Sequence, residues 1–167
     1  VVLATGARFS VCTLVDTCDA ALITNVTKDH TGGYGIDDLE TMTQVKAVVG
    51  RAATGTVVLN ARDPKLVAIA KTFQARQLVF FGDEHVAHAH AVFVRNGVIC
   101  TRDEGVEEEL IDVAEVPLTF GGAATHNVDN VLGVTAMARA LGLPKEGILN
   151  GLRTFTTRDN PGRGEIM

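Results

Sequence analysis

The sequence predicts an α/β fold, in which a three-layer, mostly parallel sheet flanked by helices is followed by a small antiparallel hairpin or meander region. Short aliphatic runs alternate with stretches of helical periodicity, the order that builds parallel strands and crossover helices. Hydrophobic residues make up 46% of the chain and aromatic residues only 5%, which suits the aliphatic strands of a buried parallel sheet. An Asn-Gly pair between two apolar runs predicts the hairpin.

The first half of the chain predicts strand, helix, strand, helix and strand, at residues 20–23, 38–53, 56–59, 64–73 and 78–81. Asp37 or Asp38 can cap the first helix, because apolar residues recur at helical spacing directly after them. Pro64 suits the first turn of the second helix, and Asp63 before it is an ordinary N-cap.

The second half predicts a hairpin of residues 89–95 and 98–102, followed by a further strand at 109–113. Two helices are predicted after it, at 127–141 and 144–155. Asn96-Gly97 supplies the hairpin turn, and the added strand completes a meander. Gly142 ends the first of these helices and Pro144 opens the second.

Charge and composition exclude several classes of protein. The net charge is −5, so the chain lacks the basic stripe with which proteins displace counterions from nucleic acid. No apolar run approaches the ~18 residues of a membrane span, and no signal-peptide pattern opens the chain. Cys12, Cys18 and Cys100 form no CxxC pair. We therefore expect a cytoplasmic protein with reduced thiols and no nucleic-acid or membrane partner.

A polar cluster runs from Thr24 to His30, directly after the first predicted strand, and contains Asn25 and Asp29. In open α/β sheets ligands bind at the carboxyl ends of strands, where loop groups converge. Asp and His can hold Mg²⁺ directly or through water, or orient a phosphate. The alternative is an Asp-capped turn with an exposed histidine.

A second cluster, Thr125-His126-Asn127-Val128-Asp129-Asn130, stands at a helix start. Asn127 and Asn130 are three positions apart, so both amides project from one helical face. Paired amide donors and acceptors can recognise an adenine edge. The alternative is simple N-capping by Asn127 or Thr125.

Two weaker motifs complete the set. Asn60-Ala61-Arg62-Asp63-Pro64 passes from a strand end into a helix, and Asn160-Pro161-Gly162-Arg163 could present an arginine to a phosphate. Three histidines could suggest a metal, but their spacing favours a solvated strand edge; they are His85, His88 and His90.

Together these segments resemble the Mur ligase superfamily in order and approximate spacing. The Pro-Leu-Thr-Phe-Gly-Gly run from Pro117 and the Asn-Pro-Gly-Arg run ending at Arg163 resemble the Mur-like, C-terminal half of cyanophycin synthetases more than peptidoglycan ligases. The resemblance implies that the fold is the second half of a Mur ligase central domain. Residues 1–167 would then be a partial ATP-binding domain without the phosphate-loop segment and the C-terminal ligase domain.

The resemblance also assigns residues. Asp29 and His30 match a metal and phosphate site. His30 and Lys46 match catalytic positions of the family. Lys46 matches a lysine that several Mur ligases carbamylate; a plain surface lysine is the alternative. The nucleotide-binding positions are His126, Asn127, Asn130 and Arg163. The supporting positions are Asn25, Asn60 and Asp63.

The implied reaction is ATP-dependent amide formation with Mg²⁺: a carboxylate attacks the γ-phosphate, and an amine then displaces phosphate from the acyl phosphate. The implied partners are ATP and an amino acid or an Asp/Arg polymer. The resemblance leaves open whether the chain forms a homo-oligomer. The chain departs from the family in having no Gly-x-x-x-x-Gly-Lys-[Ser/Thr] loop, no acid near Val2–Thr5, and Arg62 where Asp is common.

These departures leave alternatives. We expect the chain by itself not to catalyse ligation, and a catalytically inert Mur-like nucleotide-binding or assembly module is one alternative. A folylpolyglutamate or peptidoglycan-type Mur ligase is the other. All the assignments require the cluster with Asp29 and His30 and the twin amides to lie at the same edge of the sheet.

Overall fold

The computed structural model describes residues 16–27 and 38–159. Strands and helices follow the predicted order. They are β1 (Cys18–Ile23), α1 (Leu39–Ala52), β2 (Ala53–Asn60), α2 (Pro64–Ile69), β3 (Gln77–Gly82), β4 (Ala91–Arg95), β5 (Val98–Asp103), β6 (Val106–Asp112), α3 (Thr125–Ala140) and α4 (Lys145–Thr154). Short 3-10 turns are η2 (Ala70–Thr72), η3 (Val113–Glu115), η4 (Pro117–Thr119) and η5 (Thr157–Asp159).

All of these strands join one six-stranded sheet in the order β1-β2-β3-β4-β5-β6. Neighbours from β1 to β4 are parallel, and the two pairs from β4 to β6 are antiparallel. The meander therefore continues the parallel sheet instead of forming a separate unit. No helix is needed between β3 and β4, because β4 starts level with the end of β3: Ala91 pairs with Phe80.

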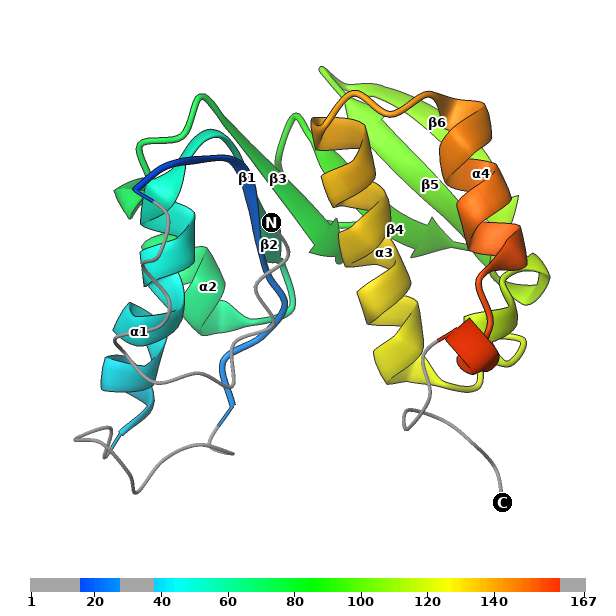
Figure 1. The fold of residues 1–167 in the computed structure, drawn as a ribbon, viewed down its shortest axis with the longest axis horizontal. Helices are drawn as coiled ribbons and strands as arrows, with labels where there is room; N and C mark the ends of the chain where they lie inside the picture. Colours follow the sequence, from blue (N-terminus) through cyan, green and yellow to red (C-terminus); the bar gives the residue numbers. More distant parts are fainter. Residues whose placement is uncertain (1–15, 28–37, 160–167) are drawn as a thin grey trace.

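Helices cover both faces of the sheet, so the predicted three-layer fold is confirmed. Figure 1 shows α1 and α2 on one face and α3 and α4 on the other. Alternate residues of β1, β2 and β3 divide between two cores, as the pleat requires. Ala21 and Ile23 of β1 pack with α1, whereas Ala20 and Leu22 belong to the core under α3.

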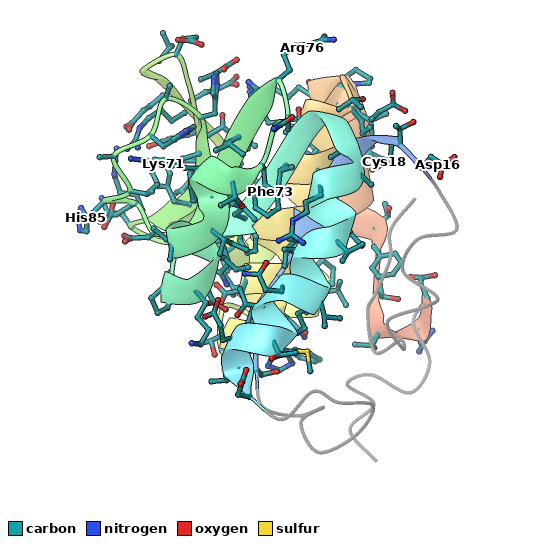
Figure 2. The ribbon with its side chains drawn as sticks, turned by 90° about the vertical axis from the view of Figure 1, so that its left-hand side faces the viewer. Asp16, Cys18, Lys71, Phe73, Arg76 and His85 are labelled. Atoms are coloured by element: carbon teal, nitrogen blue, oxygen red, sulfur yellow. The ribbon has the colours of Figure 1, made fainter. Side chains whose placement is uncertain are left out.

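Two helical glycines lie where a side chain would meet a neighbouring element. A Cβ at Gly50 of α1 would stand 2.5 Å from Phe73, the side chain labelled in Figure 2. A Cβ at Gly133 of α3 would stand 3.3 Å from Leu22 of β1 and 3.4 Å from Phe81 of β3. Gly133 therefore sets how near the middle of α3 comes to the sheet.

In the described part of the chain, no helix combines the length and the apolar character needed to cross a membrane.

Candidate functional site

Two side chains at the end of β2 hold the main chain that follows β1. The Asn60 Nδ2 donates to the Thr24 carbonyl at 3.0 Å, and its Oδ1 accepts from the Arg62 amide at 2.9 Å. The Asp63 Oδ2 accepts from the Val26 amide at 2.6 Å. Parallel neighbours bring their carboxyl ends to one edge of a sheet, which is why β2 can reach the chain beyond β1.

The Asp63 carboxylate also caps helix α2. Its Oδ1 accepts from the amides of Lys65 and Leu66 at 2.9 and 3.4 Å, which caps α2 as predicted. One carboxylate therefore fixes both the start of α2 and the position of Val26.

Lys46 reaches the same segment from α1. Its side-chain ammonium donates to the Asn25 carbonyl at 2.8 Å, and the residue is only 9% exposed. The alternative of a plain surface lysine is therefore wrong. Among the described residues, Lys46 is the only buried Lys, Arg, Asp or Glu. Three elements thus hold residues 24–26, at the start of the polar cluster that contains Asp29 and His30.

Asp29, His30 and Arg163 lie outside the described residues, and their predicted roles stay predictions. The position of the segment before Asp29 and His30 is nevertheless defined, because the side chains of Lys46, Asn60 and Asp63 bond to its main chain.

The twin amides line one cavity, as their spacing predicted. A cavity of about 800 Å³ lies between α3, α4 and the turn before α3, and its lining includes His126, Asn127 and Asn130. Its other walls are mostly apolar, with Val131 of α3 and Leu152 of α4 among them. Apolar walls with a few polar groups are typical of sites for flat organic ligands.

The nitrogen of the Asn127 side-chain amide is already hydrogen-bonded within the protein. Its Nδ2 donates to the Leu118 carbonyl at 2.8 Å, whereas the N-cap of α3 is Ala124, with no side-chain hydrogen bond. Neither Thr125 nor Asn127 therefore caps the helix, and the capping alternative is wrong. The contact orients the Asn127 amide and leaves its Oδ1 as an acceptor.

A buried threonine stabilises the turn that leads into α3. The fully buried Thr119 Oγ1 lies 2.7 Å from the Val113 carbonyl oxygen and 2.8 Å from the Val116 carbonyl oxygen, and its single proton is shared between these two acceptors. Phe120 then takes left-handed backbone (φ 51°), and Gly121 and Gly122 follow with φ of 67° and 91°. Glycine is the residue that such a run of positive φ favours. This turn fixes where α3 begins and thus where its first amides lie.

An ion pair joins the strand-end cluster to α3. The Arg62 Nη1 lies 2.7 Å from the Asp129 Oδ1, although 67 positions separate the two residues in the chain. Asp129 directly precedes Asn130, so the first turns of α3 lie beside the end of β2. In the sequence Arg62 stands out only as a departure from the family pattern, and nothing in the local pattern points to Asp129 as its partner.

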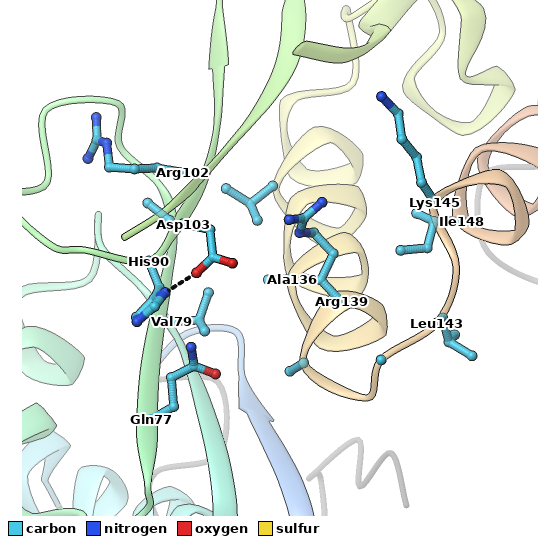
Figure 3. A pocket seen from close by; sticks show the side chains of 14 residues that line it. Gln77, Val79, His90, Arg102, Asp103, Ala136, Arg139, Leu143, Lys145 and Ile148 are labelled. Atoms are coloured by element: carbon cyan, nitrogen blue, oxygen red, sulfur yellow. Dashed lines mark hydrogen bonds and ion pairs between the residues drawn. The ribbon is translucent and has the colours of Figure 1, made fainter. Parts of the chain in front are cut away.

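A second cavity, of about 300 Å³, lies at the opposite end of α3 (Figure 3). Its charged groups already pair with one another or with neighbours. Arg139 and Lys145 share Glu108 at 3.6 and 2.6 Å, and the His90 Nδ1 lies 2.6 Å from the Asp103 Oδ1. This cavity is remote from Asn60 and Asn127, so we assign the candidate site to the other end of α3.

The histidines near β4 differ from the predicted solvated strand edge. His85 is exposed, but the His90 side chain is only 15% exposed, and His88 packs edge-on against Phe80. The described residues contain no group of three His, Cys, Asp or Glu side chains arranged to hold a metal.

Comparisons with known proteins agree with this architecture. The model of the Mur ligase middle domain matches residues 10–138. The cyanophycin synthetase of Crocosphaera subtropica is 34% identical over 164 residues, which cover 91% of this chain and 19% of that protein. The chain thus spans about a fifth of the length of that curated relative.

Solved structures show the same fold. MurF from Acinetobacter baumannii matches with a TM-score of 0.57 at 21% identity, over 81% of this chain and 29% of that one. E. coli FolC in complex with DHPP and ADP matches with a TM-score of 0.57 at 20% identity, over 85% of this chain and 31% of that one.

Proposed function

This chain belongs to the Mur ligase middle domain family, and from that premise we propose that it is part of the ATP-binding domain of an ATP-dependent ligase that joins a carboxylate to an amine. The family match confirms the resemblance found in the sequence. In the parent protein we propose a cyanophycin synthetase-like reaction through an acyl phosphate, with an amino acid or an Asp/Arg polymer as substrate.

One observation carries the proposal. The Arg62–Asp129 ion pair joins the carboxyl end of β2 to the first turns of α3, the helix that carries Asn127 and Asn130. A nucleotide that entered the cavity beside Asn127 and Asn130 would have its phosphates near the segment that Lys46, Asn60 and Asp63 hold. Polar groups that converge beside an apolar cavity suit a ligand with a flat base and a charged tail.

The adenine base fits the chemistry of this cavity. Asn130 is exposed on its lining, and its amide can donate and accept along one edge of the base. Asn127 can accept from the adenine amino group through its Oδ1, because its Nδ2 is bound to Leu118. Val134 and Phe155, which are exposed on the lining, offer the apolar surface against which the ring would pack.

The described residues do not by themselves make a Mg²⁺ site. The Asn60 Oδ1 and both Asp63 carboxylate oxygens already accept main-chain amides, and the amine of Lys46 is a donor. Mg²⁺ binding remains a proposal that depends on Asp29 and His30.

Titration of the chain with Mg-ATP tests the proposed function. We expect Asn130→Ala to weaken binding about fivefold, since a lost hydrogen bond costs roughly 1 kcal/mol. Asn150→Ala, an exposed asparagine of α4 that does not line the cavity, is the matched control and should leave affinity unchanged. Equal affinities in all three proteins, or no binding by the wild type, would reject the adenine site.

A further inference from the structure

The Arg62 side chain occupies the gap between the two clusters of the candidate site. Its main-chain amide is held by the Asn60 Oδ1 at 2.9 Å, which fixes the start of the side chain. Its stem passes Gly82, where a Cβ would come within 3.5 Å of the Arg62 Cγ. Its guanidinium ends at Asp129 of α3. The side chain thus crosses from the carboxyl end of β2 to the helix that carries the twin amides.

The guanidinium keeps unused donors. Arginine has five N–H groups in a planar fork, and the contact to Asp129 uses Nη1 alone. In the described part of the molecule, Arg62 Nε and Nη2 make no hydrogen bond, and the side chain is 52% exposed. A second acceptor can therefore approach the same guanidinium without displacing Asp129.

The unused donors of Arg62 favour an anionic ligand at this edge. Lys46 is buried below the segment after β1, and the Asp63 oxygens are occupied by amides. Arg62 is an exposed cation at the end of β2, and it is paired with the helix that carries Asn130. Phosphate oxygens match the arginine fork in geometry and charge.

We propose that Arg62 is a nucleotide-binding residue that contacts a phosphate of the bound nucleotide, and that Asp129 holds its guanidinium in position for that contact. The proposal rests on the proposed function, because it assumes that the base lies beside Asn127 and Asn130. An exposed ion pair adds little to stability, so the value of Asp129 would lie in orientation.

Comparison of ATP with adenosine tests the proposal, because adenosine has the base and ribose but no phosphate. We would titrate the isotope-labelled chain with each ligand by NMR and compare wild type, Arg62→Met, Arg62→Lys and Asp129→Asn. Met keeps the aliphatic stem of Arg62, and Lys keeps its charge. Arg139→Met is the matched control, since Arg139 forms a half-exposed ion pair with Glu108 at the far end of the same helix.

We expect Arg62→Met to weaken ATP binding at least tenfold and to leave adenosine binding within twofold of wild type. Arg62→Lys should recover part of the ATP affinity, and Asp129→Asn should lose less than Arg62→Met. Arg139→Met should leave the affinities for both ATP and adenosine unchanged. Unchanged amide spectra would establish that each variant is folded.

The contrary outcomes are distinct. Equal losses for ATP and adenosine would give Arg62 a structural role only, and no loss for either ligand would remove it from the site. Both results would overturn the Arg62 proposal while the ATP-binding domain stands. A wild-type chain that bound neither ligand would overturn the proposed function, and the Arg62 proposal with it.

Discussion

Asp63 offers the sharpest test of how the strand edge is held. Its two carboxylate oxygens do different work, since Oδ1 caps α2 and Oδ2 accepts from the Val26 amide. Asp63→Ala removes both. Loss of an N-cap costs about 1 kcal/mol, and loss of a hydrogen bond to a charged group costs roughly 1.5 kcal/mol or more. Val26 is only 8% exposed, so water cannot readily replace the lost acceptor.

We therefore expect Asp63→Ala to lower the free energy of unfolding by about 2.5 kcal/mol, with the cap and the Val26 contact both contributing. Asp63→Asn keeps one acceptor oxygen and should lose about half as much. Urea denaturation followed by circular dichroism measures these differences from the shift in midpoint at constant slope.

Asp38 provides the control within the same chain. It caps α1 through the Thr41 amide at 2.6 Å, and among the described residues its carboxylate accepts no hydrogen bond from another element. Asp38→Ala should therefore cost clearly less than Asp63→Ala. If the two substitutions proved equally destabilising, the contact between Asp63 and Val26 would contribute nothing, and the account of the strand edge given above would be refuted.

Three further outcomes are expected. Gly133→Val should destabilise the fold by about 1–3 kcal/mol, because its side chain would press on Leu22, whereas Gly151→Ala, with open space around it, should be neutral or stabilising in urea melts. Hydrogen bonds from Arg95, and then from Arg102, lower the pKa of Glu107, so the stability from this cluster is present above the ordinary value of 4.5 and is lost as pH falls through the lower folded value. Thermal melts from pH 6 to pH 3 should show that loss, and Glu107→Gln should reduce it. Finally, the chain alone should release no ADP when supplied with ATP, arginine and an aspartate-bearing polymer; coupled turnover would contradict that.

The sequence by itself determined the fold class, the order of elements and the local caps. Aliphatic runs and helical periodicity gave the alternation of strands and helices, Asn96-Gly97 gave the hairpin, and Asp38 and Asp63 gave two helix starts. These features are encoded within a few residues, because they depend on backbone preferences and on hydrogen bonds to the nearest amides. Boundaries were less exact: α2 ends at Ile69, and the 3-10 turn η2 replaces its predicted last turn.

Only the tertiary structure decided how the site is assembled. Lys46 was expected either to be modified or to lie on the surface, yet it is buried against the Asn25 carbonyl. The partner of Arg62 was not visible at all, because Asp129 is 67 positions away. Such contacts depend on strand register and on the rotation of α3 over the sheet. Both are set by packing across the whole core, which no short stretch of sequence carries.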